Sequence, residues 1–243
     1  MKINYKIGPI IIISYIIILL IITYFDFQME KAVEISTIFI LGTFVILFEN
    51  REITARTMAA LATMSALGGI LRVPFAVIPG FQPVTFIVAV TGYTLGPVNG
   101  FMVGAMCAFI SNFFLGHGPW SLWQMMGWGL CGVFFHVFKN FISKNRSIRF
   151  IILCGLWGYI YGTILNQWYV LEFLRPITFK TIVMGNVLSF WHDTLHAIGN
   201  VLFAYFFGES FIKGLERYNK RNSIIRIKNN KKSLYTNEVK SKI

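Results

Sequence analysis

Charged residues are scarce in this chain, and their scarcity excludes most soluble folds. Of its 243 residues, 13% are charged and 56% are hydrophobic, whereas soluble domains carry about 25% charged residues. Several apolar runs approach or exceed the roughly 18 residues that a membrane-spanning helix needs. The run over 7–25 does not alternate between apolar and polar positions, as the strands of a membrane barrel would. The sequence therefore predicts an all-α membrane protein.

The signatures of several chemistries are also missing. The three cysteines, Cys107, Cys131 and Cys154, lie within apolar runs and form no Cys-x-x-Cys pair, so neither a disulfide framework nor a zinc site is indicated. No phosphate-binding Gly-x-x-x-x-Gly-Lys-Ser/Thr motif and no Gly-x-Ser-x-Gly motif occurs. No apolar run carries a row of ionisable residues suited to a proton relay. We expect no cofactor, and a transporter of this kind would draw its energy from another polypeptide.

What the sequence does contain is a series of apolar runs. The first run is interpreted as a retained helix, because it is longer than the apolar part of a signal peptide and no small-residue cleavage site follows it. A polar, basic tail over 214–243 follows the last run. The eight candidate spans lie at about 8–25, 33–48, 53–71, 83–95, 98–115, 121–140, 149–168 and 185–212.

The placement of the basic residues indicates an orientation in the membrane. The net charge of +12 comes from residues between the apolar runs and in the tail, not from a basic face that would suggest nucleic acid. If the N-terminus is cytoplasmic, the extracytoplasmic loops contain only four of the 22 Lys and Arg residues: Lys31, Arg72, Arg175 and Lys180. This bias follows the positive-inside rule. We therefore expect a multi-pass protein of the cell membrane with both termini in the cytoplasm.

Two of the predicted extracytoplasmic loops are rich in proline and glycine. They contain the stretches "IPGFQPVTF" (78–86) and "GHGPWS" (116–121). Irregular backbone at membrane depth must be buried in protein or line a cavity, because lipid cannot satisfy its N–H and C=O groups. The two loops are therefore expected to meet over a cavity that opens outward, with Gln82 at its mouth and His117 in the second loop.

Polar and aromatic residues in the neighbouring runs are candidates for the wall of this cavity. Gln124 and Trp128 lie four residues apart and so share one helix face, and Asn112 lies near the end of the preceding run. Asn112 and Gln124 are equally interpretable as hydrogen-bonding groups between helices, and Trp120 as part of the interfacial aromatic belt. Arg72 either contacts an anionic substrate group or, as we favour, extends to the lipid headgroups.

The last apolar run is the most polar, with "FWHDTLHAIGN" at 190–200. Ionisable residues within a span are costly and so indicate function. The spacing of His192 and His196 is similar to the His-Glu-x-x-His motif of zinc metalloproteases, but Asp193 is shorter than Glu and no convincing third ligand is apparent. Contacts to a ligand, or an Asp–His pair that satisfies itself, explain these residues better. An intramembrane metalloenzyme is kept as the alternative from another class.

Small residues recur along the run over 53–71. Ala55, Ala59, Ala62 and Ala66 are spaced by three or four residues. Such ladders let another helix approach closely, since packing drives helix association in lipid. The ladder serves either packing within this chain or the docking of a separate subunit.

The segments "ALGGILRVPFAVIPGFQPVTF" (66–86) and "GHGPWSLWQMMGWGLCG" (116–132) carry a family resemblance. They resemble the substrate-binding S components of energy-coupling factor (ECF) vitamin transporters, and the resemblance extends over about 53–212. It implies a six-helix core over 51–213, preceded by two extra helices over 1–50 and followed by the tail over 214–243. The two extra helices depart from the six-helix pattern.

The resemblance implies a transporter subunit rather than an enzyme. Such a subunit captures a vitamin or related micronutrient from outside and then docks on a transmembrane T subunit driven by two ATPases, which the alanine ladder contacts. The loop sequences look like the cobalamin branch, so a corrinoid is expected, with a queuosine precursor or riboflavin as alternatives. A structural subunit without a ligand is a third interpretation. The expected substrate-binding residues are Gln82, Tyr93, Asn112, His117, Trp120, Gln124, Trp128, Trp191, His192, Asp193 and Asn200.

Overall fold

The computed structural model describes residues 29–49, 53–174 and 176–240, and the regular structure in these ranges is entirely helical. The first predicted span, 8–25, lies outside the described residues. The helices are α2 (Met29–Glu49), α3 (Ala55–Phe75), α4 (Val84–Leu95), α5 (Pro97–Leu115), α6 (Trp120–Val137), α7 (Lys139–Ser143), α8 (Arg146–Phe173) and α9 (Phe179–Lys240).

From the second predicted span onward, each span coincides with one of these helices. Among the described residues, four helices are long and apolar enough to cross a membrane, namely α3, α5, α8 and the 179–222 part of α9. Helix α4 has only 12 residues. The structure thus supports an all-α membrane protein, while the eight-span topology and the cytoplasmic termini stay predictions.

The helix ends follow from local residue chemistry. Thr54 caps α3, because its Oγ1 accepts a hydrogen bond from the backbone N–H of Thr57 at 3.2 Å. Gly96, with φ of 101°, separates α4 from α5, and Pro97 begins α5, where its missing N–H is not needed. Gly116, with φ of 97°, ends α5 before the second Pro/Gly-rich loop.

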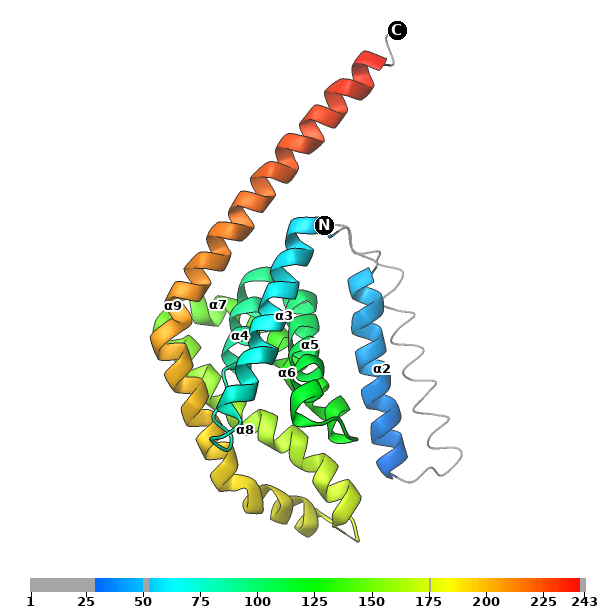
Figure 1. Cartoon of the computed structure of the whole chain (residues 1–243), viewed down its shortest axis with the longest axis vertical. Helices are drawn as coiled ribbons and strands as arrows, with labels where there is room; N and C mark the ends of the chain where they lie inside the picture. Colours follow the sequence, from blue (N-terminus) through cyan, green and yellow to red (C-terminus); the bar gives the residue numbers. More distant parts are fainter. Residues whose placement is uncertain (1–28, 50–52, 175, 241–243) are drawn as a thin grey trace.

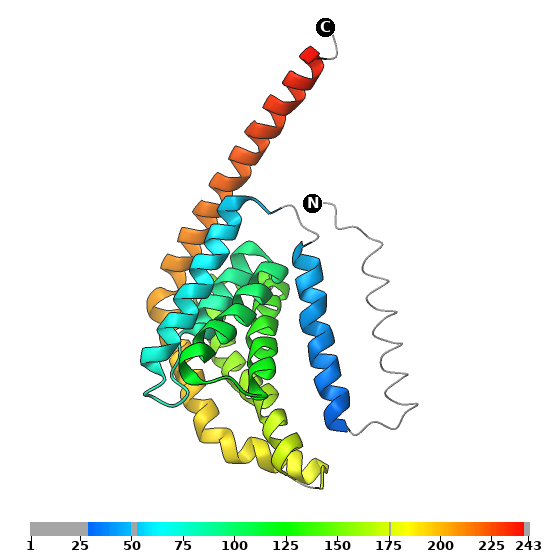
Figure 2. The same ribbon diagram turned by 45° about the vertical axis from the view of Figure 1, so that its right-hand side comes forward.

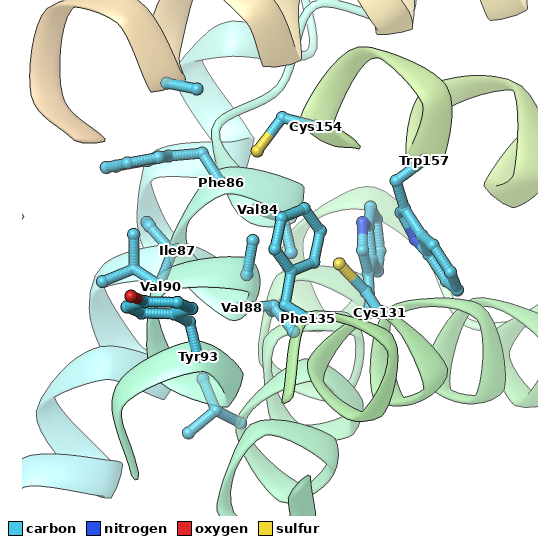
Figure 3. Close-up of a cluster of buried hydrophobic side chains, with 14 of the residues drawn as sticks. Val84, Phe86, Ile87, Val88, Val90, Tyr93, Cys131, Phe135, Cys154 and Trp157 are labelled. Carbon is cyan, nitrogen blue, oxygen red and sulfur yellow. The ribbon is translucent and has the colours of Figure 1, made fainter. Parts of the chain in front are cut away.

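Helix α4 is the central helix of the bundle. Every residue from Val84 to Thr94 is buried, as expected for a helix that is apolar all round. Figure 3 shows the side chains packed around it, including Phe135 of α6 and Cys154 and Trp157 of α8. The three cysteines are buried and unbonded, in agreement with the absence of a disulfide framework.

Glycines bring α4, α5 and α6 into backbone contact. A Cβ added to Gly100 of α5 would lie 2.6 Å from the Cα of Gly92 on α4 and 2.8 Å from the Cα of Gly132 on α6. No side chain fits between these backbones, so the three helices pack as one unit. This unit fixes the positions of α5 and α6, whose other ends carry polar side chains.

The loops predicted to be extracytoplasmic lie together at one end of the bundle. Figures 1 and 2 show the connections over 76–83, 116–119 and 176–178 at the lower end, here termed the loop end, and the α4–α5 and α6–α8 connections at the other. Helix α9 begins at the loop end and continues past the opposite end (Figure 1). Helix α2 packs on the side of the bundle, where Phe44 stacks on Phe101 at 3.7 Å.

Candidate functional site

The segment over 76–83, here termed the covering loop, is held against α9. Its Gly80 has φ of 76°, and a Cβ there would lie 2.7 Å from the backbone oxygen of His192, so glycine is required on both counts. Phe81 packs against Gly199 and against the ring of Phe203, with centroids 5.2 Å apart. The proline-rich break in the apolar chain therefore closes onto the most polar helix.

A chain of hydrogen bonds, here termed the His196 chain, joins this loop to the core. His196 Nδ1 lies 2.6 Å from the carbonyl oxygen of Gly80, and Nε2 lies 3.1 Å from Thr85 Oγ1. Since a carbonyl only accepts, Nδ1 carries the proton of a neutral ring and Nε2 accepts from Thr85. Thr85 in turn accepts from Trp128 Nε1 at 3.2 Å. The order of donors fixes the histidine tautomer and connects α6, α4, α9 and the covering loop.

A second polar network surrounds the guanidinium of Arg72, at the last turn of α3. Its Nε donates to Gln82 Oε1 of the covering loop at 3.0 Å. Its Nη1 donates to Ser111 Oγ at 2.7 Å and to Asn112 Oδ1 at 2.8 Å, both on α5. Arg72 is only 6% exposed. The expectation that it extends to the lipid headgroups is wrong, because these acceptors hold its side chain inside the protein.

Asn112 extends this network to α6 and to the second loop. Its Nδ2 donates to Gln124 Oε1 at 2.8 Å and to Ser121 Oγ at 3.0 Å. Ser121 also accepts from the backbone N–H of Gly118 at 3.1 Å, which orders the 116–119 loop. The amide of Asn112 thus uses its oxygen and both of its hydrogens. We call Arg72, Gln82, Ser111, Asn112, Ser121 and Gln124 the Arg72 cluster.

Aromatic rings connect the Arg72 cluster with the His196 chain. The guanidinium carbon of Arg72 lies 4.8 Å from the centre of the Trp128 ring, within the range of a cation–π contact. Trp128 stacks with Tyr161 of α8 at 4.6 Å, and Tyr161 contacts the His196 ring at 5.2 Å. Trp128 itself is fully buried. The two networks form one continuous polar and aromatic region beneath the covering loop.

Two further polar groups of α9 are buried near this region. Asn200 follows His196 by one turn and is 0% exposed, and neither its Oδ1 nor its Nδ2 has a hydrogen-bond partner among the described residues. Asp193 is buried between α8 and α9, where it accepts from Ser189 at 2.7 Å and Asn166 at 3.3 Å. A buried amide without partners has unused capacity to bind water or a ligand.

The structure brings some predicted site residues together and separates others. Gln82, Asn112, Gln124 and Trp128 meet at the loop end. Trp191 is 70% exposed, and the His192 side chain is 54% exposed and reaches only Asp193, at 3.7 Å. Tyr93 and Trp120 also lie apart: Tyr93 packs against Phe150 and Lys139 toward the opposite end of the bundle, and Trp120 packs against Trp168. His117 is exposed, but its Nδ1 lies 3.4 Å from Ser121 Oγ, at the edge of the Arg72 cluster.

Several members of the region were not predicted from the sequence. Ser111 lies directly before Asn112 in an otherwise apolar run, and this pairing is a signal that could have found it. Thr85 carries no such signal, because threonine hydroxyls in helices commonly bond the carbonyls of their own helix. Tyr161 carries none either, since it is one of several aromatic residues in the same run.

The surface of α3 presents the predicted alanine ladder. Ala55, Ala59 and Ala62 are exposed and Ala66 is half-buried. Met58 and Ile70, on the same helix, are also exposed. Within the part of the chain that the structure describes, these alanines are not covered by another helix.

Comparison with known proteins assigns the family. A family model described as "ECF transporter, substrate-specific component" matches residues 56–216. The chain belongs to this family. The match runs from the first turn of α3 to residue 216 within α9, and it includes every residue of the Arg72 cluster and of the His196 chain. The family is one of transporter components that are integral membrane proteins, not of enzymes.

Curated relatives are similar over a shorter region. A UPF0397 protein of Aliivibrio fischeri (strain MJ11) is 32% identical over 100 residues, which are 39% of this chain and 54% of the relative. A UPF0397 protein of Vibrio atlanticus (strain LGP32) is 31% identical over 98 residues, 38% of this chain and 53% of the relative. The chain thus spans about half the length of the curated relatives it matches. No solved structure gives a significant match.

Proposed function

We propose that this chain is the substrate-binding subunit of an ECF-type importer. It captures a micronutrient at the loop end, which faces outward, and delivers it after docking on a T subunit driven by two ATPases. One observation carries the proposal: two Pro/Gly-rich loops converge over buried polar and aromatic side chains in a member of the substrate-specific family. Among the described residues, no group of three His, Cys, Asp or Glu side chains could hold a metal, so nothing favours the metalloenzyme alternative.

The proposed binding region comprises Gln82, Asn112, Gln124, Trp128 and Asn200, together with His196. Gln82 is a half-buried residue of the covering loop, and the other groups are buried beneath it, so entry of a substrate requires that loop to move away from α9. The faces of aromatic side chains bind flat ring systems, and a few placed polar groups fix the orientation of the ligand. Trp128, with Tyr161 stacked on it, supplies the aromatic part.

The substrate that the loop sequences favour is a corrinoid. Riboflavin and a queuosine precursor are the alternatives, since both contain flat heteroaromatic rings that suit Trp128. The proposal further assigns the exposed alanines of α3 to the contact with the T subunit, because exposed small residues permit the closest approach of a second helix. Both termini are cytoplasmic in this proposal, with the 51–213 core as the binding unit and 1–50 and 214–243 as additions.

Mass spectrometry of small molecules that co-purify with the full chain in detergent tests the proposal. We expect one micronutrient in about equimolar amount, and its loss or depletion in an Asn112→Leu variant. Thr163→Val is the matched control, since Thr163 is exposed and bonds only the carbonyl of Tyr159 in its own helix. Purified protein that retains none of cyanocobalamin, riboflavin or a queuosine precursor, and co-purifies with no other small molecule, would show that the chain is not a binding subunit.

A further inference from the structure

No carboxylate whose side chain the structure describes compensates the charge of Arg72. Its hydrogen bonds go to an amide oxygen of Gln82, a hydroxyl of Ser111 and an amide oxygen of Asn112, all of them neutral. These neutral acceptors satisfy the N–H groups of Nε and Nη1, but a buried charge is normally paired with an opposite one. No ion pair joins Arg72 to a carboxylate among the residues whose side chains the structure describes.

The described carboxylates nearest to the bundle interior are engaged elsewhere. Asp193 is held by Ser189, Asn166 and His192 between α8 and α9. Glu209 and Glu216 pair with Arg146. The buried guanidinium therefore lacks one partner that its chemistry calls for, a negatively charged group.

The geometry of the guanidinium indicates where that group would bind. Nη1 is fixed by the two α5 acceptors, and Nε is occupied by Gln82, while Nη2 makes no hydrogen bond to the described residues. Carboxylates and phosphates bind two adjacent guanidinium nitrogens through parallel bonds. The Nε–Nη2 edge is such a pair, and its only occupant is a neutral oxygen of the covering loop, the segment that must move to admit a substrate.

We propose that Arg72 recognises an anionic group of the substrate, a carboxylate or a phosphate, which displaces Gln82 from Nε and binds the Nε–Nη2 edge. The inference rests on the proposed function and adds a substrate class to it: the micronutrient is negatively charged at this point. Ser111, Asn112 and the Trp128 ring hold the guanidinium in place, so that it does not reorganise on binding. Gln82 occupies the position when the site is empty.

Small anions test the site without knowledge of the substrate. The thermal unfolding midpoint (Tm) of the full chain in detergent is measured against sodium formate and sodium phosphate, with sodium chloride at matched ionic strength. A ligand that binds only the folded protein raises Tm in a saturable way. We expect formate or phosphate to raise the Tm of the wild type but not that of Arg72→Gln. Arg149→Gln is the control and should respond like the wild type, because Arg149 is bonded to the backbone of Phe141 and packs on its ring. Arg72→Lys should retain a weaker rise, because an ammonium lacks the paired donors.

A second variant keeps the test valid if Arg72→Gln does not fold. Gln82→Ala removes the competing oxygen from Nε and leaves Arg72 intact, so we expect formate to bind about 3- to 10-fold more tightly, as its charge-assisted bonds meet no competitor. An equal rise of Tm in wild type and Arg72→Gln, no rise in the wild type, or no gain in Gln82→Ala would overturn the proposal. A rise produced by phosphatidylglycerol micelles but by neither small anion would assign the site to lipid headgroups and overturn it too.

Failure of this inference is distinguishable from failure of the proposed function. If a micronutrient co-purifies and binds equally well to wild type and Arg72→Gln, the chain is a binding subunit and the anion proposal is wrong. If formate or phosphate binds in an Arg72-dependent way but no micronutrient is retained, the anion site stands and the proposed function fails.

Discussion

Asn112→Leu is the substitution whose effect follows most directly from the structure. The asparagine is 1% exposed and makes three hydrogen bonds. It accepts one from the charged Arg72 and donates one each to Ser121 and Gln124 on α6. A hydrogen bond to a charged group contributes about 1.5–3 kcal/mol, and polar contacts between membrane helices average about 0.6 kcal/mol each. Leucine has nearly the same size, and its apolar burial returns about 1 kcal/mol. We expect the free energy of unfolding to fall by about 2–3 kcal/mol.

The assay is reversible unfolding by sodium dodecyl sulfate in mixed micelles, followed by tryptophan fluorescence. The six tryptophans give the signal, and Trp128 lies against the cluster itself. Thr163→Val serves as the control and should change the free energy by less than about 0.5 kcal/mol, as surface substitutions usually do. If Asn112→Leu were as stable as this control, the hydrogen bonds assigned to Asn112 would not hold α5 to α6, and the account of the Arg72 cluster would be refuted.

Three further substitutions test other parts of the structure. Gly80→Ala places a side chain at positive φ against α9, so we expect the free energy of unfolding to fall by about 1–2 kcal/mol. Ligand retention measured by equilibrium dialysis should also weaken. Unchanged values would mean that the covering loop does not pack against α9 at Gly80. Gly100→Leu should abolish the monodisperse peak in size-exclusion chromatography, because no side chain fits between the backbones of α4, α5 and α6. Gly214→Leu should keep the peak, since Gly214 has open space around it. Equal profiles would contradict the backbone contact at Gly100. The double substitution Ala62→Phe and Ala66→Phe should leave ligand binding intact. It should reduce uptake by whole cells more than about tenfold, because the larger side chains would clash with the T subunit at the proposed docking face of α3. Normal uptake would mean that the alanine ladder has another role.

The helices were largely predictable because the thickness of the bilayer sets the length of a spanning helix, and glycine and proline mark the positions where one helix ends and the next begins. Gly96 and Pro97 separate α4 from α5 where the sequence predicts, and Gly116 ends α5. The end of α9 was not predictable in the same way. The apolar pattern stops near residue 212, but helical backbone continues to Lys240, since lysine, arginine and asparagine in water do not by themselves break a helix.

The site was predictable only in part, because sequence spacing gives the face of a helix but not what covers it. His192 and His196 are one turn apart, yet only His196 is buried, since Gly80 and Phe81 lie over that turn of α9. For Arg72, the sequence allows both an extended and a buried side chain. The choice depends on acceptors 39 and 40 positions away, Ser111 and Asn112, which no local pattern indicates.

Helix α9 contacts both the loop that follows α3 and the beginning of α3. His196 bonds Gly80 in that loop, and farther along α9, Asn222 donates to Thr57 at 2.9 Å at the beginning of α3. The helix is uninterrupted from His196 to Asn222, a distance of about 40 Å at 1.5 Å per residue. A rigid displacement of α9 that frees Gly80 would therefore also shift or break the distant threonine contact, so a movement at the loop end of the bundle is transmitted mechanically to the opposite end.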